Sequence, residues 1–313
     1  MSIISLIFIK GVKINFQEII MSRKITEILK TGKILVSDGA WGTFLQQNGL
    51  KTGECPELWC IERADDILKI AGSYINADAD IIQTCSFGGT SYKLAHYGLA
   101  DRVAEINEAA AKISREAAGD KFVVASIGPT GEIILPGDEE LACDLYAAFK
   151  EQALALERGG ADAACIETMS SIDEAVAAIR AVKENTRLEI ICTFTFELSV
   201  HGDYRTMMGV SPEQAIEAAV SAGADISGTN CGNGMSGMIK IIEAMRKINK
   251  DTPLLVHANA GLPQNINGLD IFPESPEDMA QIVPDLVKAG ANIIGGCCGT
   301  TPAHISAIKK AVI

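Results

Sequence analysis

The 313-residue sequence has no apolar run long enough to cross a membrane and no excess of basic residues. A membrane-spanning helix needs about 20 apolar residues in succession, so we expect no membrane segment. The chain carries 27 Lys and Arg against 40 Asp and Glu, and its net charge of −13 argues against binding nucleic acid. It also lacks a linker or a low-complexity tract, and its 48% hydrophobic residues suffice for a large core in a single domain.

A secretory signal is also lacking. The apolar stretch at residues 3–9 is not preceded by the basic region that a signal peptide carries. The nine cysteines are odd in number and Cys297 and Cys298 are adjacent, which does not fit a disulfide framework. We therefore expect a cytoplasmic protein whose grouped cysteines serve a metal or catalysis. Residues 1–20 are predicted to be an extension outside the native start, and residues 21–313 the folded domain.

Short apolar, β-rich segments alternate with longer segments of helical periodicity, which is typical of repeated βα units. Eight segments are predicted to be strands: 34–40, 79–86, 122–128, 163–169, 189–196, 226–231, 254–260 and 293–298. Runs that are apolar throughout indicate parallel strands buried on both faces. The fold class is therefore predicted to be α/β, a single-domain TIM (β/α)₈ barrel, with an open doubly wound sheet as the alternative.

Several helix boundaries can be predicted from capping residues. A hydroxyl side chain followed by proline predicts a helix start at Ser211, Ser275 and Thr301. A Gly-Ala-Asp or Gly-Ala-Asn sequence just before a strand recurs three times, and its glycine is predicted to end a helix in the left-handed conformation: Gly160, Gly223 and Gly290.

Three cysteines stand at the C-terminal ends of predicted strands, where the active sites of barrels lie. Cys231 ends the sixth strand, and Cys297 and Cys298 end the eighth. Three thiolates could bind one zinc ion and leave its fourth position open, as catalytic zinc sites do. A disulfide between adjacent cysteines would be strained, so a shared metal explains the pair better. From spacing alone, small cysteines buried in a reducing core remain the alternative.

Four motifs together resemble the homocysteine S-methyltransferase family, which includes the homocysteine-binding barrel of cobalamin-dependent methionine synthase and betaine–homocysteine methyltransferase. They are Asp38-Gly-Ala-Trp-Gly-Thr43, Gly228-Thr-Asn-Cys-Gly232, Ala258-Asn-Ala-Gly-Leu-Pro263 and Gly295-Gly-Cys-Cys-Gly-Thr-Thr-Pro302. They occur in the family's order between residues 34 and 304. The block with two adjacent cysteines, together with the separate Asn-Cys-Gly, is the most specific part of the resemblance.

The resemblance implies a zinc-dependent S-methyltransferase that moves a methyl group to the thiol of homocysteine and forms methionine. Cys231, Cys297 and Cys298 would be the Zn²⁺ ligands and the catalytic centre. The thiolate is the competent nucleophile, but a free thiol with a pKa of about 8.5 is mostly protonated at neutral pH. Zinc that takes the substrate sulfur as its fourth ligand would hold that sulfur as a thiolate.

The resemblance also implies contacts with the amino acid end of homocysteine. Glu167 would pair with the ammonium, assisted by Asp38, and backbone amides around Gly39 and Ala40 would receive the carboxylate. A structural carboxylate at the barrel rim is the alternative for Glu167, and a turn residue is the alternative for Asp38.

Other polar and sulfur-containing residues have simpler interpretations. Asn230 and Asn259 are expected to brace loops around the site, and His257 to be a polar plug inside the seventh strand. Residues predicted to lie in the core are Cys143, Cys165 and Cys192. Cys85 stands where methionine synthase relatives have asparagine, which leaves the shape of the substrate pocket open.

The methyl donor is less well determined than the acceptor. Candidates are methylcobalamin carried by a separate corrinoid protein, S-methylmethionine, S-adenosylmethionine and a betaine. The segment 128–136 resembles the methionine synthase branch, and we find no corrinoid-binding domain in the sequence, so we favour methylcobalamin on a partner protein. One alternative is a demethylase that passes a methyl group to a corrinoid protein. Another is a non-catalytic barrel that stores zinc or thiols.

Overall fold

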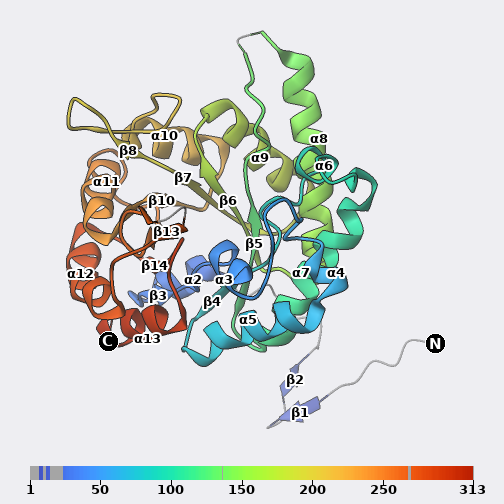
Figure 1. The fold of residues 1–313 in the computed structure, drawn as a ribbon, viewed down its shortest axis with the longest axis horizontal. Helices are drawn as coiled ribbons and strands as arrows, with labels where there is room; N and C mark the ends of the chain where they lie inside the picture. The colour runs from blue at the N-terminus through green and yellow to red at the C-terminus, as the bar shows by residue number, and fades with distance from the viewer. Residues whose placement is uncertain (1–6, 10–11, 15–23, 136, 267–268, 313) are drawn as a thin grey trace.

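A parallel sheet of eight strands forms a barrel inside a layer of helices (Figure 1). The computed structural model describes residues 7–9, 12–14, 24–135, 137–266 and 269–312. In spatial order the strands are β3 (Leu35–Val36), β14 (Ile293–Gly296), β11 (Leu254–Asn259), β10 (Ile226–Gly234), β7 (Glu189–Phe194), β6 (Ala163–Met169), β5 (Phe122–Ile127) and β4 (Ile81–Gln83). Seven of the predicted segments contain one of these strands, and the segment 226–231 covers all but the last three residues of β10. The predicted single-domain TIM barrel is confirmed.

The barrel closes between β3 and β4, which are its two shortest strands. Only a bridge between Ser37 and Ile81 joins them in parallel. The Asp38 amide donates to the Ile81 carbonyl (3.0 Å), and the Asp80 amide donates to the Val36 carbonyl (2.7 Å). β3 is shorter than the predicted segment 34–40, because the regular ladder ends at Val36 and only the bridge at Ser37 and the bonds of Asp38 continue the pairing.

Helices connect the strands and cover the outside of the barrel (Figure 1). They are α2 (Ile25–Leu29), α3 (Gly42–Gln47), α4 (Trp59–Glu62), α5 (Ala64–Asn76), α6 (Ser91–Ala95), η1 (Ala100–Arg102), α7 (Val103–Ala118), α8 (Glu139–Gly159), α9 (Ile172–Asn185), α10 (Pro212–Ala222), α11 (Met235–Ile248), α12 (Pro276–Ala289) and α13 (Pro302–Ala311). None of them, within the described ranges, is long and apolar enough to cross a bilayer.

The predicted helix boundaries are confirmed. Ser211, Ser275 and Thr301 are N-caps in capping boxes, each followed by proline in the first turn. α8, α10 and α12 end at glycines in the left-handed conformation, with φ angles of 102°, 111° and 112°. The prediction that Cys143 belongs to the core is wrong, because it lies on the exposed side of α8, whereas Cys165 and Cys192 are buried as predicted.

Three antiparallel hairpins supplement the barrel. β8 (Glu197–Leu198) pairs with β9 (Tyr204–Arg205) in the loop after β7, and β12 (Gln264–Ile266) pairs with β13 (Leu269–Ile271) in the loop after β11. β1 (Ile7–Ile9) and β2 (Val12–Ile14) form the third hairpin, within the predicted extension. The rest of that extension lies outside the described residues, so the predicted boundary after residue 20 stays a prediction.

The interior of the barrel near the N-terminal ends of the strands is apolar and is covered by α2. Inward-facing side chains pack there with two residues of α2: Ile25, Leu29, Leu35, Ile81, Phe122, Val124, Ala163, Cys165, Ile191, Ile226, Leu255 and Ile293. The Glu189 carboxylate accepts hydrogen bonds from the first amides of α2, which belong to Ile25 and Thr26. This end of the barrel is therefore a packed core and not a binding cavity.

At the N-terminal ends of the strands, four side chains accept a hydrogen bond from a backbone amide of the neighbouring strand. The pairs are Asp80 with Val36 (3.0 Å), Asp162 with Val123 (2.8 Å), Asp225 with Ile190 (2.9 Å) and Asn292 with Leu254 (2.9 Å). Three of the four complete the repeated Gly-Ala-Asp or Gly-Ala-Asn sequence. Within three residues, the repeat therefore ends a helix with its glycine and bonds the neighbouring strand with its Asp or Asn side chain.

Candidate metal centre and active site

A cavity of about 300 Å³ lies among the loops that follow the C-terminal ends of the strands. Six of the seven predicted site residues line it: Gly39, Ala40, Glu167, Cys231, Cys297 and Cys298. They come from β3, β6, β10 and β14 or the loops that follow them, so residues far apart in the sequence meet at one end of the barrel. The seventh, Asp38, is buried and bonds Gln83 and Trp41, which line the cavity.

The three cysteine sulfurs lie close enough to share one metal ion. Their Sγ atoms are all within 4.8 Å of one another, and those of Cys231 and Cys298 are 4.0 Å apart. Zinc–sulfur bonds of about 2.3 Å in a tetrahedron place the sulfurs about 3.8 Å apart, which agrees with this spacing. Cys231, Cys297 and Cys298 form the only such group of His, Cys, Asp or Glu found in the described part of the chain.

Tight turns of the backbone bring the sulfurs together. Cys231 itself has a φ of 57°, in the left-handed region that non-glycine residues rarely adopt, and Gly232 follows with a φ of 70°. A Cβ atom on Gly232 would lie 2.6 Å from the Phe196 carbonyl oxygen. At the end of β14, Gly299 also has a positive φ, of 80°. Gly232 and Gly299 therefore permit the turns that bring the cysteines together.

Two asparagines brace the cysteine loops, as predicted. The side-chain oxygen of Asn230, Oδ1, accepts from the Thr168 backbone amide and from the Thr193 hydroxyl, both at 2.8 Å. The side-chain oxygen of Asn259, Oδ1, accepts from the Cys298 backbone amide at 3.1 Å, and the same side chain also bonds the Cys231 sulfur. The asparagines thereby connect the cysteine-bearing loops to neighbouring strands.

The crowded thiols compete for a single negative charge. Hydrogen bonds from the other two thiols lower the pKa of Cys231 to about 3. Because they donate to Cys231, the pKa of Cys297 is raised and that of Cys298 rises to about 12. Three thiolates at this spacing need a cation to hold them together, which is the property that a zinc ion supplies. The donor set therefore fits zinc.

Glu167 ends in the cavity without a cationic side chain beside it. The residue is 7% exposed, and its carboxylate accepts hydrogen bonds from the Ser126 hydroxyl and from the Gln83 side-chain amide, the latter at 3.0 Å. Burial raises the pKa of Glu167, although these hydrogen bonds oppose the rise. No lysine or arginine is among the described residues that line the cavity. A bound ammonium group would therefore find an uncompensated carboxylate.

Asp38 holds two residues that line the cavity. Its carboxylate accepts from the Trp41 indole (2.9 Å), the Gln83 amide (2.8 Å) and the Ser37 hydroxyl (3.1 Å). Burial raises the pKa of Asp38 to about 7. The Ala40 amide, which we expected to receive a substrate carboxylate, donates to the Thr300 hydroxyl at 3.0 Å and so already has a partner.

Gln83 and Ser126 were not predicted to belong to the site, although both line the cavity and donate hydrogen bonds to the Glu167 carboxylate. The available signal was a polar residue inside an otherwise apolar strand. His257 is buried as the predicted polar plug, its Nε2 has no hydrogen-bond partner, and burial lowers its pKa to about 4. Cys85 belongs to the cavity wall, where its sulfur lies 3.7 Å from the Pro56 carbonyl oxygen.

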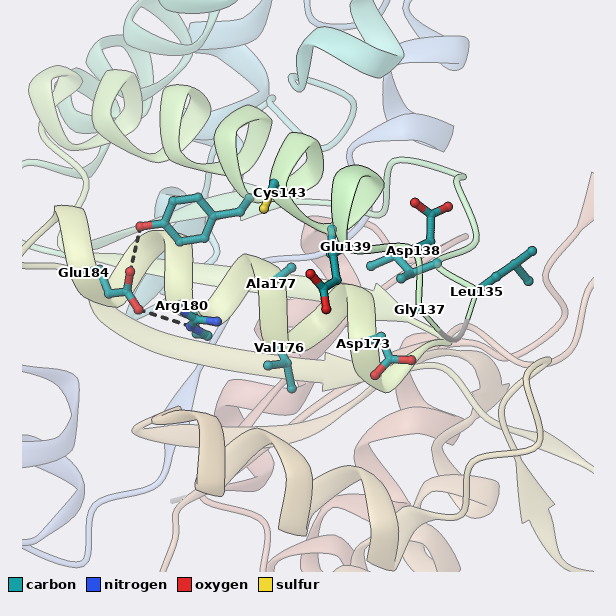
Figure 2. Close-up of a pocket in the computed structure, with 13 residues that line it drawn as sticks. Leu135, Gly137, Asp138, Glu139, Cys143, Asp173, Val176, Ala177, Arg180 and Glu184 are labelled. Atoms are coloured by element: carbon teal, nitrogen blue, oxygen red, sulfur yellow. Dashed lines mark hydrogen bonds and ion pairs between the residues drawn. The ribbon is translucent and has the colours of Figure 1, made fainter.

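A larger hollow of about 660 Å³ lies outside the barrel, between α8 and α9 (Figure 2). Cys143 and several carboxylates surround it, and Glu184 accepts from the Tyr146 hydroxyl at 2.7 Å and pairs with Arg180 at 3.1 Å. Among the described residues around it there is no cluster of thiols. The chemistry is therefore gathered in the smaller cavity at the strand ends.

Comparisons with known proteins agree in the family and in the fold. Residues 35–312 match the family model described as homocysteine S-methyltransferase. Methionine synthase of Mycobacterium tuberculosis is 30% identical over 298 residues, covering 90% of this chain and 25% of that protein. Methionine synthase of Mycobacterium leprae is 30% identical over 311 residues, covering 92% and 25%. The chain thus spans about a quarter of the length of these curated relatives.

Among solved structures, the homocysteine methyltransferase MmuM from Escherichia coli has a similar fold. Its metallated form gives a TM-score of 0.74 at 23% identity, covering 91% of this chain and 98% of that one. Its oxidized form gives a TM-score of 0.73 at 22% identity with the same coverage.

Proposed function

Because the chain belongs to the homocysteine S-methyltransferase family, we propose that it is a zinc-dependent enzyme that transfers a methyl group to the thiol of homocysteine and forms methionine. The observation that carries this proposal is the group of three cysteine sulfurs at one wall of a cavity whose floor holds an uncompensated carboxylate. Homocysteine has a thiol for the first feature and an ammonium group for the second.

Cys231, Cys297 and Cys298 would hold the zinc ion and leave one coordination position for the substrate sulfur. When bound, zinc keeps a coordinated thiol deprotonated at neutral pH, which makes the sulfur nucleophilic. Glu167 would accept the ammonium group of homocysteine, and the backbone at Gly39 and Ala40 would lie against its carboxylate. Asp38 assists by holding the Gln83 amide and the Trp41 indole.

We further propose that the methyl donor is methylcobalamin carried by a partner protein. A corrinoid ring is much larger than the cavity of about 300 Å³, so its methyl group would have to approach from the mouth. Exposed apolar side chains stand on the loops at this end of the barrel, including Leu135 after β5, Val200 and Met207 after β7, and Leu262 after β11. A partner protein that brings the methyl group to the mouth of the cavity could contact these side chains.

A transfer assay tests the function. Zinc-loaded protein should form methionine from homocysteine with one member of a panel that contains methylcobalamin, S-methylmethionine, S-adenosylmethionine and betaine. Methylcobalamin is expected to be the active donor. Methylation of a cob(I)alamin protein without any methionine formed would identify a demethylase instead.

X-ray absorption at the zinc edge tests the role of the thiols. Without substrate the shell should contain three sulfurs and a lighter atom, and with saturating homocysteine it should contain four sulfurs. A shell of four protein ligands that homocysteine does not change would indicate a closed storage site.

A further inference from the structure

Gln83 connects the two buried carboxyl groups at the floor of the cavity. Its backbone amide donates to the Asp38 carboxylate at 2.8 Å, and its side-chain amide donates to the Glu167 carboxylate at 3.0 Å. Gln83 is the last residue of β4, whereas Glu167 is on β6, so the side chain reaches past β5 inside the barrel. It is 6% exposed and lines the cavity.

The contact restricts how the Glu167 carboxylate can turn. Rotation about the last torsion of a glutamate side chain is broad, so hydrogen bonds must set the plane of the carboxylate. Ser126 holds one oxygen and Gln83 holds the other. A carboxylate has about four lone-pair sites, so each oxygen keeps a site for a further donor. The direction in which those sites point is set by the two residues that already bind.

A neutral amide suits this position better than a cation does. A lysine or arginine bonded to Glu167 would neutralise it and compete with a bound ammonium group. The Gln83 amide stabilises the ionised carboxylate through a hydrogen bond but adds no charge, and it opposes the rise in the pKa of Glu167 that burial causes. The contact therefore favours the ionised form without supplying a positive charge that would compete with a bound ammonium group.

We propose that Gln83 is a positioning residue for the amino acid end of the thiol substrate, anchored by Asp38 and acting through Glu167. This inference rests on the proposed function. It assigns the recognition of the ammonium group to a unit of three side chains and not to Glu167 alone.

The test compares two thiols that differ only in the amino group, homocysteine and 4-mercaptobutanoate. Calorimetric titration of zinc-loaded Gln83→Leu should show homocysteine binding about tenfold or more weaker than to the native protein, because a hydrogen bond to a charged group is lost. Binding of 4-mercaptobutanoate and zinc content should be unchanged. The matched control is Gln152→Leu, a buried glutamine that donates to the Ser86 carbonyl at 2.8 Å and does not line the cavity. It should preserve the preference for homocysteine.

A double-mutant cycle with Glu167→Gln completes the test. Adding Gln83→Leu to Glu167→Gln should weaken homocysteine binding little further, because the two residues act as one unit. The inference is overturned if Gln83→Leu keeps the native preference for homocysteine, or if it weakens the binding of both thiols equally. Native protein that binds neither thiol would instead refute the proposed function, so the two failures can be told apart.

Discussion

Carboxylates at the two ends of the barrel differ in whether a cationic side chain pairs with them. At the N-terminal end, Asp80 pairs with Lys309 at 2.6 Å and with Lys33 at 3.2 Å, and Asp162 pairs with Arg115. At the C-terminal end, Asp38 and Glu167 are bonded to amides, hydroxyls and the Trp41 indole but to no cationic side chain of the described residues. Asp80 and Asp162 are thus neutralised by cationic side chains of the fold, whereas Asp38 and Glu167 could be neutralised by a bound cation.

The pKa values of the carboxyl groups follow this difference. Burial alone would raise the pKa of Asp80, but hydrogen bonds from Lys309 and Val36 and the nearby lysines hold it below its ordinary value. Burial prevails at Asp38, whose pKa rises to about 7, and at Glu167. The ion pairs of Asp80 and Asp162 are therefore expected to stabilise the barrel, whereas buried carboxyl groups with raised pKa values, such as Asp38 and Glu167, are typical of a functional site.

The largest effect should come from removing a thiol at the C-terminal end. Cys298→Ala should lose bound zinc and abolish methyl transfer while the barrel stays folded, because the large core does not depend on the metal. Cys165→Ala is the matched control, since Cys165 is a buried thiol in the apolar layer near the other end. It should unfold at a lower temperature but keep its zinc. Metal analysis and the transfer assay measure both, and an active, zinc-loaded Cys298→Ala would disprove the assignment.

A smaller effect, on stability alone, is expected at the N-terminal end. Asp162→Ala leaves the Val123 amide and the Arg115 guanidinium without their shared partner. The free energy of unfolding in urea should fall by about 1–3 kcal/mol, with KM and kcat of the transfer reaction unchanged. A change in KM without a loss of stability would contradict the separation of the two ends.

The smallest effect should be a difference in how stability depends on pH. The folded-state pKa of Asp80 is depressed, so its stabilising contribution is present above the unfolded-state value of about 3.9 and is lost as pH falls through the folded-state value. The folded-state pKa of Asp38 is raised to about 7, so stability is lost as pH rises from about 4 to about 7. Asparagine imitates the protonated acid at both positions.

Thermal unfolding of Asp38→Asn and Asp80→Asn should therefore diverge. From about pH 5 to about pH 8, Asp38→Asn should gain stability relative to the native protein, whereas the cost of Asp80→Asn should stay constant and shrink only in more acidic buffer. Parallel pH profiles for the two variants would show that the ends do not differ in this way.

Much of this arrangement could be predicted from the sequence. Apolar runs identified the eight strands, and the strand-end positions of Cys231, Cys297 and Cys298, together with the family resemblance, predicted that the three thiols meet. The location of Asp38 could not be predicted, because it depends on how early β3 ends. The contact between Gln83 and Glu167 spans a strand and depends on the register of the whole barrel.

Features outside the barrel pattern were also missed. The β8–β9 hairpin adds no strand to the sheet and has only two residues in each arm, too few for a visible alternation. Cys143 was assigned to the core on helical periodicity, but the groove between α8 and α9 leaves that side of α8 exposed. Local patterns do not reveal which face of a helix lacks a neighbour.

Closure of the barrel has a consequence for the newly made chain. β3 pairs with β14, and the Ala40 amide meets the Thr300 hydroxyl 260 positions further along the chain. During synthesis on a ribosome, β3 therefore lacks its partner on one side until β14 has been synthesised. Cys297 and Cys298 directly follow β14, and Cys298 comes 67 positions after Cys231. The three thiols proposed to bind zinc are therefore present together only once nearly the whole barrel has been translated.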